Sequence, residues 1–60
     1  MKVRIYEDEL YPFYGFPEQD EQFNVQTVDI PDEKVNWIRK TMKEFDAVQK
    51  YLRGAYEGKI

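Results

Sequence analysis

The chain has 60 residues, of which 17% are aromatic, and it contains neither cysteine nor histidine. A chain of this length forms one domain with a small core, and its composition excludes disulfide bonds and the common zinc sites as reinforcement. The formal net charge is −3, and no apolar run approaches the roughly 20 residues of a transmembrane helix. We therefore expect a soluble, cytoplasmic domain that relies on aromatic packing or on association with another chain.

Residues 2–7, KVRIYE, alternate between apolar and polar side chains. Val3 and Ile5 share one face, which is the period of a half-buried strand. We expect this strand to lie against the core, with Ile5 deeply buried.

The acidic run Glu7 to Glu9 follows, and it predicts a turn or an exposed edge because three carboxylates cannot be buried together. Residues 10–16, LYPFYGF, are then predicted to form a second strand in a hairpin with the first. Pro12 requires that strand to be irregular or at a sheet edge, and Gly15 indicates a bulge or a close backbone approach. We expect the rings to fill the core, with an exposed patch for a partner as the alternative.

Residues 17–22 are predicted to form a polar, solvated loop, which lacks the glycine and the final bidentate acid of a calcium-binding loop. Residues 23–30, FNVQTVDI, alternate again and predict another strand. Their apolar phase changes near Thr27, where we expect a bulge or the end of the strand.

Residues 31–57 carry the longest periodic signal and predict one long amphipathic helix, with Pro31 suited to its first turn. Residues at a strict heptad spacing define a seam: Val35, Ile38, Met42, Phe45, Gln49, Leu52 and Tyr56. A polar residue in such a seam fixes register at a cost in stability, so Gln49→Leu is expected to raise thermal stability. Phe45 and Leu52 are expected to be deeply buried.

The predicted fold is therefore α+β: a small two- to three-stranded antiparallel sheet in residues 1–30, followed by one long C-terminal amphipathic helix, all in a single domain of residues 1–60. A helix of 26 residues would span about 39 Å, and a strand of seven residues only about 23 Å. The uncovered part of the seam is expected to face another copy, which makes a homo-oligomer.

Catalytic chemistry is not predicted, because serine, cysteine and histidine are all absent and the glycines stand alone. We expect no enzyme activity, no cofactor and no metal site. The excess of acids, concentrated in the first half of the chain, also opposes direct nucleic-acid binding.

Acids at predicted turns are free to serve recognition, and they could engage a basic groove of a protein partner; the alternative is a merely solubilising surface. Together with two rings of the aromatic block, the candidate partner-binding residues are Glu7, Asp8, Glu9, Tyr11, Tyr14, Glu18, Asp20 and Glu21.

The segments KVRIYEDELYP, IPDEKV and EFDAVQKYL resemble short uncharacterised proteins encoded by bacteriophages and prophages. That resemblance implies a small, early-expressed accessory protein of the host cytoplasm, in a class of which some members bind and inhibit host enzymes or defence systems. The predicted function is a non-enzymatic, acidic protein-binding module, such as a phage-type inhibitor of a host nuclease or defence complex. The alternatives are a structural or assembly protein whose helix mediates homodimerisation, and small-molecule sequestration at a tyrosine-lined dimer interface.

Overall fold

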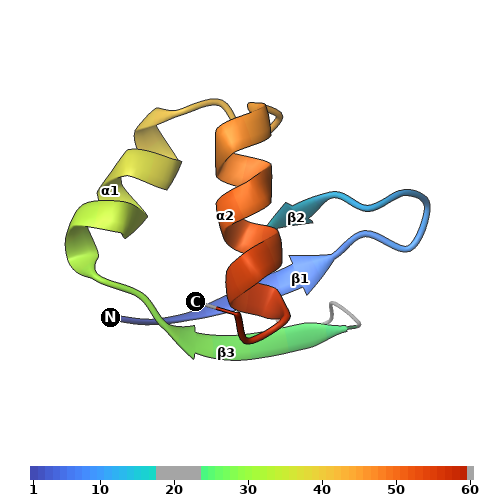
Figure 1. Cartoon of the computed structure of the whole chain (residues 1–60), viewed down its shortest axis with the longest axis horizontal. Helices are drawn as coiled ribbons and strands as arrows, with labels where there is room; N and C mark the ends of the chain where they lie inside the picture. The colour runs from blue at the N-terminus through green and yellow to red at the C-terminus, as the bar shows by residue number, and fades with distance from the viewer. Residues whose placement is uncertain (18–23, 60) are drawn as a thin grey trace.

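The computed structural model describes residues 1–17 and 24–59. Within these residues, a three-stranded antiparallel sheet of order β2-β1-β3 is followed by two helices (Figure 1). The elements are β1 (Lys2–Glu7), β2 (Tyr14–Gly15), β3 (Val25–Asp29), α1 (Asp32–Lys40) and α2 (Asp46–Tyr56). The α+β class and the antiparallel pairing of the first two strands are confirmed, although β2 covers only Tyr14–Gly15 of the strand predicted over residues 10–16. The single long C-terminal helix is wrong.

The central strand β1 pairs with both neighbours and sets the buried face of the sheet. Val3 pairs with Val28 and Glu7 pairs with Tyr14, so these side chains share one face with Ile5. The pairing of β3 continues without interruption past Thr27 to Asp29, so neither the bulge nor the strand end expected near Thr27 is present. The change of phase is resolved differently, because Val28 and Ile30 pack in or against the core whereas Thr27 is exposed.

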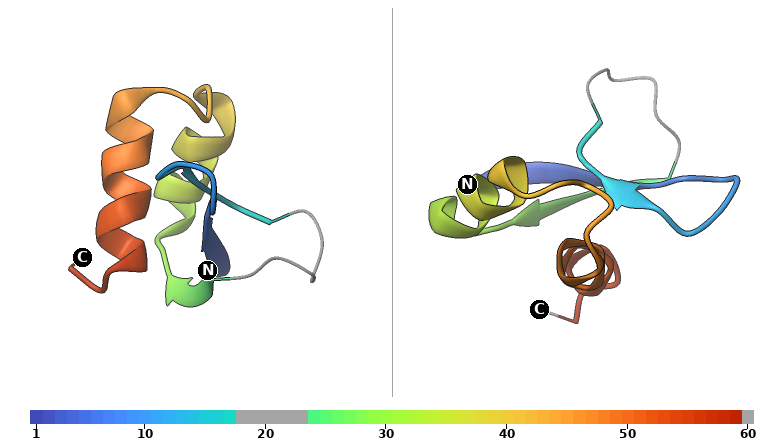
Figure 2. Two further views of the ribbon diagram at one scale, coloured as in Figure 1. Left: turned by 90° about the vertical axis from the view of Figure 1, so that its right-hand side faces the viewer. Right: turned by 90° about the horizontal axis from the view of Figure 1, so that it is seen from above.

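The core lies where α2 packs across this face, and α1, which lies beside the sheet, adds Val35 and Ile38 to it. Its buried side chains are Val3, Ile5, Tyr14, Ile30, Val35, Ile38, Val48, Leu52 and Ala55. Ile5 and Leu52 are fully buried, as expected. Figure 2 shows α2 packed against one face of the sheet, and Figure 1 shows it crossing the strands.

The helical region is interrupted after Lys40. Thr41 adopts an extended conformation, with φ −95° and ψ 145°, and Phe45 is also extended where it precedes α2. A straight helix of 26 residues would span about 39 Å, whereas the longest dimension of the whole molecule is 27 Å. The turn brings α2 back across the face of the sheet, where Val48, Leu52 and Ala55 join Val35 and Ile38 of α1 in one core.

This interruption corrects the predicted seam. Val35, Ile38 and Leu52 lie in the intramolecular core, whereas Met42 and Phe45 lie in the connection between the helices, 75% and 55% exposed. The expected burial of Phe45 is therefore wrong. The heptad residues do not form a continuous stripe. The predicted homodimer, in which the seam of one long helix faces a second copy, is therefore not supported by this structure.

The two helices contact each other through aromatic side chains. The rings of Trp37 in α1 and Tyr51 in α2 meet edge to face at 6.2 Å. The Lys34 ammonium lies 4.9 Å and 5.1 Å from these two ring centres, within the range of cation–π attraction. This cluster stabilises the folded-back arrangement of α1 and α2.

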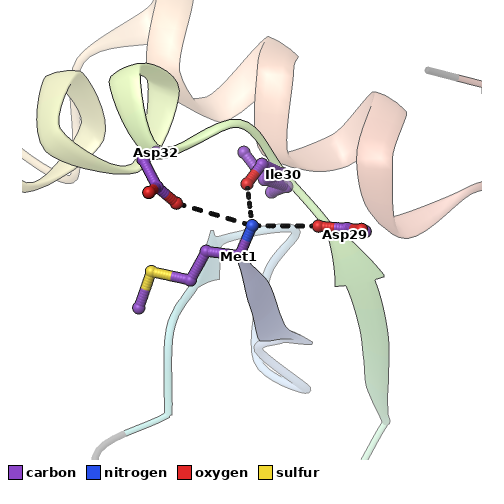
Figure 3. A network of polar contacts seen from close by, with 4 residues as sticks. All are labelled: Met1, Asp29, Ile30 and Asp32. Carbon is purple, nitrogen blue, oxygen red and sulfur yellow. Dashed lines mark hydrogen bonds and ion pairs between the residues drawn. The ribbon is translucent and has the colours of Figure 1, made fainter.

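The amino group of Met1 joins the start of β1 to the junction of β3 and α1 (Figure 3). It donates hydrogen bonds to Asp29 Oδ1 at 2.9 Å and to the Ile30 carbonyl at 2.8 Å, and it lies 3.5 Å from the Asp32 carboxylate. The hydrogen bond to Asp29 raises the pKa of the amino group, and the same bond lowers the pKa of the Asp29 carboxyl.

Candidate functional site

The turn between β1 and β2, residues 8–12, projects from the sheet and is named here the hairpin tip (Figure 1). Its backbone is held by hydrogen bonds from the Asp8 N–H to the Phe13 carbonyl at 2.8 Å and from the Phe13 N–H to the Tyr11 carbonyl at 2.7 Å. The Asp8 carboxylate accepts a third bond from the Leu10 N–H at 2.8 Å, which is the geometry of an Asx turn. The tip is therefore an ordered turn.

Two apolar side chains stand out from this tip. Leu10 is 87% exposed and Tyr11 is 63% exposed. The ring of Tyr11 meets the edge of the Phe13 ring at 6.4 Å, and Phe13 in turn lies 6.4 Å from Tyr6. The aromatic contacts orient Tyr11 while leaving most of its surface accessible. Exposed apolar side chains held in one place are characteristic of protein-binding surfaces.

Acidic residues flank these apolar side chains. Asp8 and Glu9 lie in the turn, as the sequence predicted, whereas Glu7 is the last residue of β1 and pairs with Tyr14. The other predicted acids, Glu18, Asp20 and Glu21, lie outside the described residues. The hairpin tip thus combines apolar contact area with negative charge.

Tyr14 occupies a different environment from the rest of the predicted partner-binding set. It is only 5% exposed, and its ring lies 5.5 Å from that of Tyr56. Burial raises the pKa of the Tyr14 hydroxyl. Tyr14 was predicted to contact a partner, but its ring belongs to the core and offers little surface for such a contact. The aromatic block is divided, with Tyr14 buried, Phe16 packed against the core and Tyr11 exposed.

Gln49 closes the outer edge of β2. Because Asp8 and Phe13 form a hydrogen-bonded pair, the ladder's alternation directs the N–H and C=O of Tyr14 away from β1. The Gln49 amide meets both groups: Oε1 accepts from the Tyr14 N–H at 2.7 Å, and Nε2 donates to the Tyr14 carbonyl at 2.8 Å. Nε2 also donates to the Lys43 carbonyl in the helix connection. The side chain thus takes the place of a neighbouring strand.

A groove of about 190 Å³ separates the base of the hairpin tip from α2. It is lined by Pro12, Tyr14, Asp46, Gln49, Lys50 and Arg53. Its volume is below the range of roughly 300–1,000 Å³ that is usual for ligand pockets. Its lining carries charges of both signs, from Asp46 and from Lys50 and Arg53.

Sequence reasoning missed two residues of this region. Leu10 lies within an aromatic block that was expected to be core, although the acids before it and Pro12 after it are signals of an exposed turn. Gln49 was interpreted as a register residue, and its polar character on an apolar helix face was the available signal. Its partner, Tyr14, is 35 positions away in the sequence.

Within residues 1–17 and 24–59, no group of three or more acidic side chains is placed to hold a metal ion. In the same ranges, neither helix is long and apolar enough to cross a membrane. Comparison with protein-family models, curated proteins and solved structures gives no match.

Proposed function

We propose that this protein is a non-enzymatic, acidic protein-binding module that presents its hairpin tip to a protein partner. The observation that supports this proposal is a Leu10 side chain 87% exposed on a turn whose backbone is fixed by hydrogen bonds. Burying Leu10 and Tyr11 in a partner removes apolar area from water. Because the turn is already ordered, binding loses little conformational entropy.

The chemistry of the tip defines its partner. Asp8 and Glu9 directly precede Leu10 and Tyr11, and Glu7 ends the strand before them, so the matching surface is an apolar pocket with basic residues beside it. A nucleic-acid-binding groove has such basic residues. The resemblance to phage-encoded proteins suggests a host protein, such as a nuclease or a defence complex, which this chain would inhibit by occupying that groove in the host cytoplasm.

The first experiment identifies the partner and tests the tip together. The full chain is immobilised, proteins captured from a bacterial lysate are identified, and the dissociation constant is measured for the purified partner. The double variant Leu10→Ala, Tyr11→Ala should bind at least about tenfold more weakly, since interface anchors each contribute more than about 1 kcal/mol.

The matched control is Met42→Ala, Phe45→Ala, which removes two exposed apolar side chains from the connection between the helices. It should bind like the parent. Unchanged binding by the tip variant, with loss of binding by the control variant, would place the interface at the connection and overturn the proposal.

The second experiment isolates the acids. Glu7→Gln, Glu9→Gln leaves Asp8 to hold the Leu10 N–H, and Glu33→Gln, Glu44→Gln removes the same charge elsewhere. Electrostatic steering predicts an association rate about tenfold lower for the tip variant at low salt, and a smaller difference at high salt. Equal association rates for the two variants would show that the acids do not guide binding.

A further inference from the structure

The two edges of the sheet differ in one respect that bears on association. At the β2 edge, the outward backbone groups of Tyr14 are satisfied by Gln49. Hydrogen bonds at both ends of β3 define how it pairs with β1. The Ile30 N–H donates to the Met1 carbonyl at 2.8 Å, and the Glu7 N–H donates to the Asn24 carbonyl at 3.4 Å. These are hydrogen-bonded pairs, so the register fixes which groups of β3 point outward.

The alternation places the N–H and C=O groups of Gln26 and Val28 toward β1, and those of Val25, Thr27 and Asp29 away from it. Within the described residues, no hydrogen bond to these outward backbone groups is found. Figure 1 shows β3 along the lower border of the molecule, where neither helix lies beneath it.

Natural proteins usually protect such edges with proline, lysine, a bulge or a covering element. The strand VQTVD has no proline and no lysine, and its register with β1 is continuous. The β3 edge is therefore a regular template for another strand, in contrast to the β2 edge that the chain closes with its own side chain.

We propose that β3 pairs in antiparallel orientation with β3 of a second copy, about a two-fold axis at Thr27. In this register Thr27 lies opposite Thr27 of the second copy, and Val25 lies opposite its Asp29. Each of these pairs can exchange two backbone hydrogen bonds, because all three residues direct their N–H and C=O groups outward.

The edge is self-complementary, which is why we propose a second copy and not an unrelated peptide. The only charged side chain of the strand, Asp29, lies opposite Val25 and not opposite another carboxylate. Paired threonines at the axis are a favourable cross-strand combination. An isologous interface of this kind requires the same strand to match itself, and this strand does.

The dimer would join the two sheets into one and leave both β2 edges, with their hairpin tips, at its outer ends. The antiparallel pairing directs the two tips in opposite directions. Self-association therefore does not depend on the partner proposed for the tip, and failure of either proposal leaves the other intact.

The test is sedimentation equilibrium of the full chain from micromolar to millimolar concentration. The parent should reach a dimer and no larger species. Thr27→Lys or Thr27→Glu places like charges opposite each other at the axis, and each should weaken dimerisation at least about tenfold. An equimolar mixture of the two variants should restore a heterodimer, since unlike charges then meet.

Asn36→Lys, at an exposed position of α1, is the matched control and should dimerise like the parent. Thermal melting of each variant checks folding, because Thr27 pairs with Arg4 and a lysine there adds a second cation. Amide hydrogen exchange provides an independent measurement. Exchange at Val25, Thr27 and Asp29 should slow as concentration rises, whereas Gln26 and Val28 should be protected at every concentration.

A monomer at millimolar concentration, with rapid exchange at Thr27, would overturn the proposal. So would a dimer that neither charge at residue 27 weakens, since its interface would then lie on another surface. The Thr27 axis is supported if the equimolar mixture of the two charge variants dimerises while each variant by itself does not.

Discussion

Replacing Gln49 with leucine tests the internal architecture most sharply, because the structure and the heptad pattern predict opposite results. A seam glutamine exchanged for leucine should stabilise the protein. A glutamine that satisfies the outward backbone groups of Tyr14 should not be replaceable by leucine without loss. The structure therefore predicts that Gln49→Leu is destabilising.

The magnitude follows from the bonds that are lost. Each neutral hydrogen bond contributes about 1 kcal/mol net, and a partly buried N–H or C=O left unpaired costs about as much or more. Losing both bonds to Tyr14 should cost about 2 kcal/mol, against a total stability of about 3–5 kcal/mol for a domain of this size. The exposed bond from Gln49 Nε2 to the Lys43 carbonyl is lost as well and adds to this cost. Leucine methyl groups packed near Tyr14 offset only part of this loss.

The assay is urea denaturation followed by the fluorescence of Trp37. With a slope of about 1 kcal/mol/M, the midpoint should fall by about 2 M. Lys50→Leu, an exposed neighbour on the same helix, is the control and should leave the midpoint nearly unchanged. Gln49→Glu, which retains an acceptor for the Tyr14 N–H but loses the donor, should be intermediate. In the leucine variant, amide exchange at Tyr14 should also accelerate.

A Gln49→Leu variant that is as stable as the parent, or more stable, would refute this reasoning. It would show that the amide contributes nothing at the β2 edge. The hydrogen bonds from Gln49 would then not distinguish the stability of the β2 edge from that of the unpaired β3 edge.

Two further predictions concern the core and the pH dependence. Ile5→Ala removes a fully buried side chain and should cost about 2–5 kcal/mol of stability, which largely unfolds the domain. Phe45→Ala should cost less than about 1 kcal/mol, because that ring is 55% exposed. Circular dichroism at 25 °C distinguishes the two variants, and an equal loss of folded protein in both would contradict this packing. The pKa of Asp29 is lowered from 3.8 and that of the Met1 amino group is raised from 8.0, so their pairing stabilises the fold fully between these values and is lost as the pH falls or rises through the respective folded-state pKa. Asp29→Asn should therefore lower the melting temperature most near pH 6 and least at extremes of pH, and a pH-independent difference would exclude the ion pair as its cause.

The local parts of the fold could be predicted because their signals are local. The alternation of Val3 and Ile5 gave the bounds of β1, and Pro31 marked the start of the first helix. Residues 41–45, TMKEF, contain neither glycine nor proline, so nothing in that segment indicated the interruption. It arises from tertiary packing, because the turn brings the buried Val48, Leu52 and Ala55 of α2 back across the face of the sheet.

The candidate site depended still more on non-local structure. The acids at the β1–β2 turn were predicted because carboxylates avoid burial. The division of the aromatic block could not be predicted, since Tyr14 is buried through contacts with α2 residues such as Tyr56. The exposure of Leu10 could not be predicted either, because it results from a turn that points away from both helices.

The most direct test of the proposed function is the hydrogen-exchange footprint of the full chain bound to its captured and purified partner. We predict that the strongest protection on binding lies at Glu9, Leu10 and Tyr11, with residues 41–45 unaffected. Protection confined to residues 41–45 or to β3, with the hairpin tip exchanging as in the free protein, would contradict the proposal that this tip is the recognition element.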